Sequence, residues 1–230
     1  MTTDAFFSIT GVQPYDEALQ VQRRLNSMVS VGTIEGCFII LEHEEVYTCG
    51  IHRDKSDVKT VSGIRMVERG GGITYHCPGQ IVIYFILNLR KLGINVKELI
   101  GIVHGALIQY MNGLGIQGES RLGIETGIWV GNRKICSTGF AIRGDATFHG
   151  IALNYNNSLS GFLKIDPCGF SPEIMTSCKE IGNEKIPPLE EAKEMISRIL
   201  CEKLSIKIDN KISWDMVVNI SNGQLSQTVP

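Results

Sequence analysis

The chain has 230 residues, of which 43% are hydrophobic, and its formal net charge at pH 7 is −2. This length and hydrophobic content allow a buried core, and the near-neutral charge is not typical of a nucleic-acid-binding or membrane-surface protein. No apolar run reaches the roughly 18 residues that a membrane-spanning helix needs, and the first residues, MTTDAFFSIT, are unlike a presequence, so we expect a soluble, cytoplasmic protein.

Three helices are predicted by hydrophobic residues that recur three and four positions apart. The first spans Tyr15 to Met28, with acidic residues near its start and arginines further along. The second runs from Val96 to Leu114 and ends at Gly115, and the third runs from Leu189 to Leu204 after two prolines.

Strands are predicted between these helices. The stretch CFIILEHEEVYTCG, residues 37–50, is typical of a strand that leaves the core. GIWVGNRKICSTGFAI, residues 127–142, indicates a hairpin around Gly131 and Asn132, because both tolerate positive φ; Lys134 then lies just past the turn. The polar end, from about residue 216 to 230, is predicted to be a loose tail. The fold class is therefore α/β, a single mixed domain over residues 1–230.

Seven cysteines are spread along the sequence without a CxxC pair. Their spacing predicts neither a zinc ribbon nor a small disulfide framework, and it disfavours a thiol redox protein. We expect reduced thiols that are mostly buried as small hydrophobic residues.

The first candidate site motif is RGGGITYHCPGQ, residues 69–80. Its glycines precede a strand, whereas a dinucleotide fingerprint places them between a strand and a helix, and GxxxxGK[ST] is absent, so no nucleotide site is indicated. Such glycines indicate either a bulge or tight turn, or a backbone that a ligand approaches closely. His76 is either a structural group or a catalytic one.

KIDPCGF, residues 164–170, is the second candidate motif. Pro167 and Gly169 would hold the thiol of Cys168 on a tight turn, where backbone amides are available to an oxyanion. The alternative is a turn cysteine without a role, since a reactive thiol needs a neighbour that favours the thiolate. Lys134 is the candidate neighbour, and its alternative is a solvated surface lysine.

The third candidate motif is FHGIALN, residues 148–154. It would place His149 and the Gly150 amide at a strand end, where backbone donors can hold a carbonyl or carboxylate.

Together, in this order, LEHEEVYTCG, RGGGITYHCPGQIVIYFILNL, TGIWVGNRKICSTG, FHGIALN, KIDPCG and MTSCKE resemble the lipoyl(octanoyl) transferases across residues 30–182. The resemblance implies a fold of the biotin and lipoate protein ligase type, a mixed sheet flanked by helices. It also implies transfer of an octanoyl group from the phosphopantetheine thioester of acyl carrier protein to a lysine of the lipoyl domains of 2-oxoacid dehydrogenases or of the glycine cleavage H protein. Neither a metal nor ATP is implied.

The same resemblance assigns roles to residues. Cys168 would be the nucleophile that carries the acyl group and Lys134 its acid–base partner, with His76 and His149 orienting groups around the thioester. We call the implied substrate-binding residues the predicted acyl-binding set: Arg69, Gly70, Gly71, Gly72, Ile73, Thr74, Tyr75, His76, Ser137, Thr138, Gly139, Gly150, Ile151 and Ala152. The glycines of this set would leave room for an unbranched acyl chain.

Three cysteines depart from the usual family pattern. Cys77 stands where glycine is usual, Cys136 where alanine is common and Cys178 where leucine is more typical, and we expect Cys77 and Cys136 to lie near the acyl groove. Two alternative functions stay open: an ATP-dependent lipoate or biotin ligase on the same fold, and a non-catalytic module that binds lipoyl domains.

Overall fold

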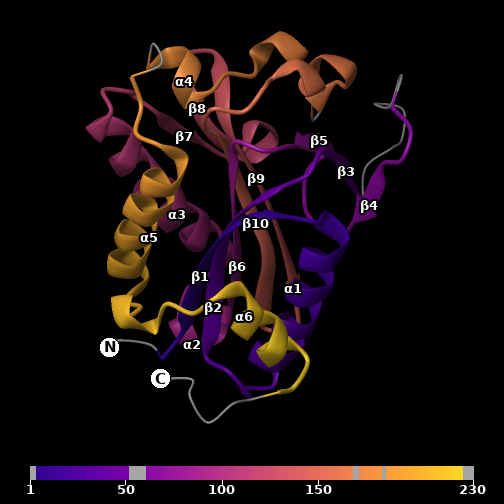
Figure 1. Ribbon diagram of the computed structural model, residues 1–230, viewed down its shortest axis with the longest axis vertical. Helices are drawn as coiled ribbons and strands as arrows, with labels where there is room; N and C mark the ends of the chain where they lie inside the picture. Colours follow the sequence, from indigo (N-terminus) through magenta and orange to yellow (C-terminus); the bar gives the residue numbers. More distant parts are fainter. Residues whose placement is uncertain (1–3, 52–60, 168–170, 183–184, 225–230) are drawn as a thin grey trace.

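A seven-stranded mixed sheet runs through the structure, a computed structural model that describes residues 4–51, 61–167, 171–182 and 185–224 (Figure 1). The first two strands are parallel and all other neighbours are antiparallel. In spatial order the strands are β1 (Phe6–Gln13), β2 (Gly36–His43), β6 (Gln80–Leu87), β10 (Ala146–Asn154), β9 (Arg133–Arg143), β8 (Gly127–Val130) and β7 (Glu119–Arg121).

Three shorter strands form a second sheet beside the first. Its order is β4 (Arg65–Val67), β3 (Val46–Gly50) and β5 (Ile73–His76). The chain passes from the large sheet to the small one at Glu44 and Glu45, which are exposed. The single strand predicted for residues 37–50 is therefore wrong: two strands in different sheets occupy that stretch.

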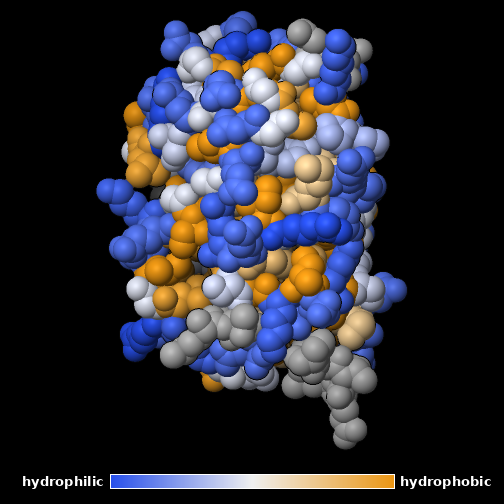
Figure 2. Space-filling view, turned by 90° about the vertical axis from the view of Figure 1, so that its left-hand side faces the viewer, coloured by the Kyte–Doolittle hydropathy of each residue, from blue (hydrophilic) through white to orange (hydrophobic). Residues whose placement is uncertain are grey.

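Helices cover both faces of the large sheet (Figure 1). On one face, α3 (Val96–Gly113) and α5 (Leu189–Leu204) pack against β1, β2 and β6, and on the other α1 (Tyr15–Ser30) and α6 (Trp214–Ser221) do so. Two short helices, α2 (Leu89–Leu92) and α4 (Cys178–Ile181), complete the described α-helices. Hydrophobic and hydrophilic side chains are interspersed on the outer surface shown in Figure 2. None of the helices in the described ranges has the length and apolarity of a membrane span.

The three helices predicted from periodicity are confirmed as α1, α3 and α5, and the hairpin as β8 and β9. α3 begins with a capping box, in which the Asn95 side chain accepts from the Glu98 amide and Glu98 accepts from the Asn95 amide. The α/β class is confirmed as well.

The loose tail predicted from about residue 216 is wrong as far as Ser221. That segment belongs to α6, which Ser213 caps and whose Val217 and Ile220 are buried against α1 and the sheet. Residues 225–230 lie outside the described part of the chain.

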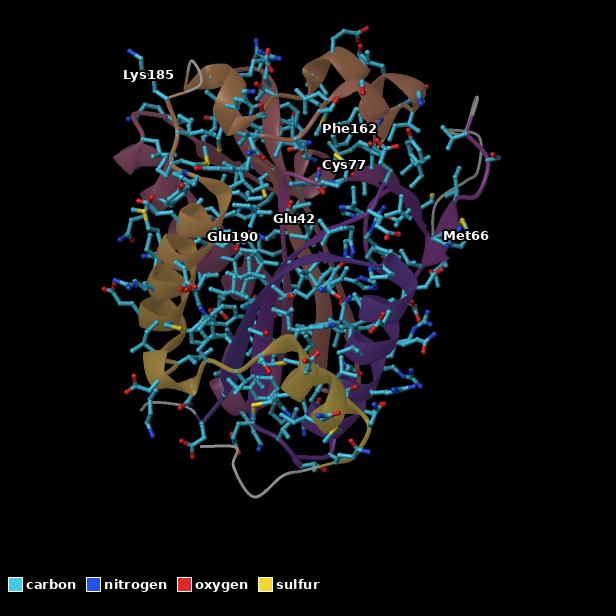
Figure 3. The ribbon with its side chains drawn as sticks, viewed as in Figure 1. Glu42, Met66, Cys77, Phe162, Lys185 and Glu190 are labelled. Atoms are coloured by element: carbon cyan, nitrogen blue, oxygen red, sulfur yellow. The ribbon has the colours of Figure 1, made fainter. Side chains whose placement is uncertain are left out.

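A buried ion pair joins α5 to the sheet. Lys193 is fully buried, and its Nζ donates to Glu42 Oε1 at 2.7 Å, to Glu190 Oε1 at 2.7 Å and to the carbonyl of Thr10 at 3.1 Å. The other carboxylate oxygen of Glu42 accepts from the Gly79 amide at 2.6 Å. Glu42 and Glu190 are labelled in Figure 3. This network links α5 to the loop that follows β5.

Candidate active site

A cavity of about 400 Å³ lies where β9 and β10 meet the loop before β5, with α1 and α3 on either side. It brings together three segments that are far apart in the sequence and that were predicted to form one site. From the predicted acyl-binding set, the cavity is lined by Arg69, Gly70, Gly71, Thr74, His76, Ser137, Thr138, Gly139, Gly150, Ile151 and Ala152, and Lys134 and His149 line it too.

Three members of the set do not line this cavity. Because side chains alternate along β5, Thr74 and His76 face the cavity while Ile73 and Tyr75 turn into a separate hydrophobic cluster. Gly72 is buried just before that strand. The structure therefore does not bring Gly72, Ile73 and Tyr75 to this cavity, and their role in acyl binding stays a prediction.

Close contact between backbones explains several glycines at the cavity. The Gly70 amide donates to the carbonyl of Phe140 at 3.0 Å, which holds the loop before β5 against β9. A Cβ on Gly139 would lie 2.7 Å from the Gly70 oxygen, and one on Gly50 would lie 2.3 Å from the Gly71 oxygen. Glycine is required here so that the loop can fit between β3 and β9, and not only to leave room for a ligand.

Arg69 clamps the same loop. Its guanidinium donates to the Thr48 hydroxyl at 2.9 Å, to the Thr48 carbonyl at 2.7 Å and to the Gly70 carbonyl at 3.0 Å. Thr48 lies in β3, so the arginine joins the small sheet to the cavity wall. Its buried positive charge also helps to lower the pKa values of His76 and His149.

The hydrogen bonds of His76 fix its tautomer. The carbonyl of Thr176 accepts from the Asn154 amide nitrogen at 3.0 Å, so the Asn154 oxygen accepts from Gln80 Nε2 at 2.9 Å. Gln80 Oε1 is then left to accept from His76 Nδ1 at 2.7 Å. His76 therefore carries its proton on Nδ1 and leaves Nε2 as an acceptor. Burial, together with the charges nearby, lowers the pKa of His76 to about 3, which keeps the ring neutral.

His149 has a strained backbone and a buried ring. Its φ of 59° lies in the left-handed region, and its amide donates to Gln22 Oε1 at 2.9 Å. His149 Nε2 has no hydrogen-bond partner among the described residues. Burial is the main reason that the pKa of this ring is lowered to about 3.

Tyr84 lines the cavity on the α1 side, and His43 lies behind it. The Gln13 carbonyl accepts from His43 Nδ1 at 2.8 Å, so His43 Nε2 accepts from the Tyr84 hydroxyl at 2.6 Å. Tyr15 contacts the rings of both His43 and His76.

The sequence patterns did not single out several residues that line the cavity, because α1, α3, the 3₁₀ helix at Gly123–Glu125 and the strands β6 and β9 bring them there only in the folded chain. These residues are Tyr15, Val82, Tyr84, Val96, Ile100, Gly123, Ile124, Thr126 and Phe140.

Lys134 is buried at the start of β9, with 5% of its surface exposed. Its Nζ lies 5.7 Å from the centre of the Trp129 ring. Gly127 on the neighbouring strand has φ 151°, and a Cβ there would lie 2.6 Å from Lys134 Cε and 2.4 Å from the Cys136 carbonyl oxygen. Lys134 is therefore not a solvated surface lysine.

Cys168, the predicted nucleophile, lies outside the described residues. The chain that follows it returns to Lys134: Met175 forms a parallel bridge with Lys134, and the Thr176 amide donates to the Lys134 carbonyl at 3.0 Å. Ile165, which precedes Cys168, is buried in the same hydrophobic cluster as Met175. The roles of Cys168 and Lys134 stay predictions.

Cys77 and Cys136 lie beside the cavity, next to its lining residues His76 and Ser137, but neither lines it. Cys77 is buried on the far side of β5 in the cluster with Phe162, as the labels in Figure 3 show. Cys136 belongs to the core beneath the sheet. Burial raises the pKa of Cys77, and it raises the pKa of Cys136 to about 12, so both are held as thiols.

Within the described ranges, no group of three or more His, Cys, Asp or Glu side chains is placed to hold a metal ion.

Comparison with known proteins shows relatives along most of the chain. Residues 14–200 match the family described as the lipoyl protein ligase A/B catalytic domain. The chain is 40% identical over 211 residues to the probable octanoyltransferase 2 of Picrophilus torridus, covering 92% of this chain and 84% of that one. It is 35% identical over 223 residues to the octanoyltransferase of Thermoanaerobacter pseudethanolicus, covering 93% and 96%.

Solved structures share the fold at low sequence identity. Lipoate-protein ligase A bound with ATP superposes with a TM-score of 0.71 at 12% identity, covering 98% of this chain and 94% of that one. The apo biotin protein ligase of Aquifex aeolicus gives a TM-score of 0.51 at 13% identity, covering 89% and 70%. A mixed sheet of the biotin and lipoate ligase type, flanked by helices, is thus confirmed.

Proposed function

Because the chain belongs to the lipoyl protein ligase A/B catalytic domain family, we propose that it moves an octanoyl group from a thioester donor, through its own Cys168, to a lysine amine. The chain is an octanoyltransferase, an acyltransferase of lipoate biosynthesis. One observation supports the route through the enzyme: the cavity joins Lys134 to most of the predicted acyl-binding set, and the segment after Cys168 pairs with Lys134.

The proposed reaction has two half-reactions. In the first, the Cys168 thiolate attacks the octanoyl thioester, and the donor leaves as a free thiol after taking a proton from Lys134. One thioester replaces another, so this step is close to thermoneutral and needs no ATP. In the second, the acceptor amine attacks the Cys168 thioester and forms an amide, which is a downhill step.

The cavity fits an unbranched acyl chain. Val96 and Ile100 of α3, together with Ile151 of β10, give it apolar walls, and Gly139 and Gly150 line it where their backbone packs closely against Gly70 and Ile83. His76, held neutral as an acceptor, and His149 orient groups at its polar wall. We propose these residues as the acyl-binding site.

The partners follow from the same proposal. The donor is octanoyl-acyl carrier protein, whose phosphopantetheine carries the acyl group, and the acceptors are lipoyl domains of 2-oxoacid dehydrogenases and the glycine cleavage H protein. A solved structure of the same fold is a lipoate protein ligase with its E2 lipoyl domain, which supports a lipoyl domain as acceptor. Neither a metal nor ATP takes part, and the reaction belongs in the cytoplasm.

Intact-protein mass spectrometry tests the proposal. The chain is incubated with octanoyl-acyl carrier protein in the absence of ATP, beside Cys168→Ala and the control Cys77→Ala. We expect the wild type and Cys77→Ala to gain one octanoyl group that hydroxylamine removes, and Cys168→Ala to gain none.

An adduct on Cys168→Ala would contradict the role of this thiol. If the wild type forms no adduct, ATP-dependent attachment of free octanoate to a lipoyl domain separates a ligase from a binding module that has no activity.

A further inference from the structure

His104 is a buried histidine that the reaction above does not use. It lies on α3 and is fully buried. Its Nε2 bonds to the Thr138 hydroxyl at 2.8 Å and its Nδ1 to the Ser120 hydroxyl at 2.6 Å. Thr138 lines the cavity, whereas Ser120 is exposed on β7. The three side chains thus form a continuous hydrogen-bonded path from the cavity to the surface.

The chemistry of this path differs from that around two other histidines of the structure. Backbone carbonyls fix the tautomers of His43, directly through Gln13, and of His76, through Asn154 and Gln80. A hydroxyl can both donate and accept, so neither tautomer of His104 is imposed by its partners. A chain of hydroxyl, imidazole and hydroxyl can pass a proton from one end to the other.

Lys134 lies within electrostatic reach of this chain. Burial, and to a smaller extent the positive charge of Lys134, together lower the pKa of His104 to about 4. Among the described residues, Lys134 is the charged group that acts on His104. Lys134 and Thr138 line the same cavity.

Amide formation releases a proton inside this cavity. An acceptor lysine has a reference pKa of about 10.4 and arrives as an ammonium ion at neutral pH. The octanoyl thioester of the enzyme and the ammonium group react to give the amide, the free enzyme thiol and one proton. The C–S bond breaks and the C–N bond forms. Of the three ammonium protons, one stays on nitrogen and a second goes to sulfur. The third must reach solvent. Thioester exchange between two thiols releases no net proton.

We propose that Thr138, His104 and Ser120 form a relay that carries this proton from Lys134 to solvent during amide formation. The inference rests on the proposed function. Lys134 accepts the proton from the incoming amine, Thr138 passes it to one nitrogen of His104, and the other nitrogen releases its proton to Ser120 and so to solvent. His104 is thus a positioning and relay residue that touches neither acyl group nor acceptor.

Separate measurement of the two half-reactions tests the relay. Octanoyl-acyl carrier protein loads the enzyme, and quenched-flow mass spectrometry follows loading and, after addition of an apo lipoyl domain, amide formation. In His104→Gln, the amide replaces the imidazole and fills the same space without a titratable ring. We expect loading to stay at the wild-type rate and amide formation at about pH 7 to slow about tenfold or more.

The pH profile provides the readout that a structural role would not change. Near the pKa of the acceptor amine, at about pH 10, a neutral amine attacks and no proton has to leave, so the rates of His104→Gln and wild type should converge. His43→Gln is the matched control: it also removes a buried, doubly bonded histidine, and the ratio of its two rates should stay as in the wild type. Ser120→Val, on an exposed strand, blocks the outer end and should slow amide formation alone even if His104→Gln does not fold.

Three results would overturn the relay. These are equal slowing of both half-reactions, no slowing of amide formation, and slowing that persists at high pH. If the wild type does not load at all, the proposed function itself fails, and that outcome is distinct from the other three.

Discussion

Backbone carbonyls determine how the histidines beside the cavity are protonated. A carbonyl only accepts, so the Gln13 oxygen requires a proton on His43 Nδ1, and the Thr176 oxygen sets the amide orientations that require one on His76 Nδ1. Both rings are buried and neutral, and each leaves Nε2 as an acceptor. Rings held neutral in a fixed tautomer do not exchange protons at neutral pH, which leaves Lys134 as the acid–base group of the proposed mechanism.

Gly127→Ala should disrupt the site through Lys134. The new Cβ would lie 2.6 Å from Lys134 Cε and 2.4 Å from the Cys136 oxygen, at a φ of 151° that L-residues rarely adopt. We expect a loss of about 1–3 kcal/mol in the free energy of unfolding from the strained backbone, and a drop in loading and amide formation by about 100-fold as Lys134 is displaced. Urea denaturation and the two half-reaction rates measure these effects.

Gly131→Ala is the matched control for that variant. Gly131 also has positive φ, 57°, but a Cβ there would meet nothing within 4 Å. It should cost about 1–2 kcal/mol of stability and leave both half-reaction rates unchanged. Equal activity of the two variants would contradict the displacement of Lys134.

Among the helices and strands, hydrophobic periodicity predicted those elements whose local sequence is enough to determine them. α1, α3 and α5 follow from apolar residues on one helix face, and the hairpin of β8 and β9 from its turn residues. The break between β2 and β3 was missed because Glu44 and Glu45 mark it without a glycine or a proline, although the two strands pair in different sheets. α6 was missed because its sequence is short and polar at its end, and it is stabilised by packing against α1.

The residues of the site also fall into those that local sequence could predict and those that it could not. Residues within contiguous motifs, such as Arg69 to Gly71 and Gly150 to Ala152, could be predicted to meet because the resemblance supplies their common site. Residues on α1 and α3, such as Tyr15 and Val96, carry no local signal, because a helix face that lines a cavity has the same hydrophobic pattern as one that packs in a core. Only the tertiary structure shows whether such a helix face lines a cavity or packs in a core.

Lys193→Met should test how α5 is joined to the sheet. The substitution removes the ammonium and leaves the buried Glu42 carboxylate without its cation, so we expect a loss of about 3–5 kcal/mol in the free energy of unfolding. Glu190 is the exposed partner of the same lysine, and 69% of its side-chain surface is exposed. Glu190→Gln should therefore lower the free energy of unfolding by less than about 1 kcal/mol. Urea denaturation measures both, and comparable losses would show that the buried pair contributes no more than a surface one.

Over the whole molecule, the two faces of the large sheet differ in what packs against them. The face under α3 and α5 holds the larger hydrophobic cluster and the ion pair that ties α5 to the loop after β5. The face under α1 leads into the polar end of the cavity, where Tyr15, Tyr84 and the histidines gather. The cavity therefore lies between an apolar layer and a layer of buried polar side chains.

The burial of four neutral histidines should make the protein sensitive to acid. Burial lowers the pKa values of His43 and His104 to about 4 and those of His76 and His149 to about 3, against an ordinary value of 6.5. Between these limits the unfolded chain binds protons that the folded chain does not, so the stability from the neutral rings is complete above about pH 6.5 and is lost as the pH falls toward 4. With four such groups, the loss reaches at most about 5 kcal/mol per pH unit, well before most carboxylates titrate. Urea denaturation at about pH 7, 6 and 5 should show this decline, His43→Gln should make it about one quarter shallower, and equal stability at pH 7 and 5 would mean that these rings are protonated in the folded state.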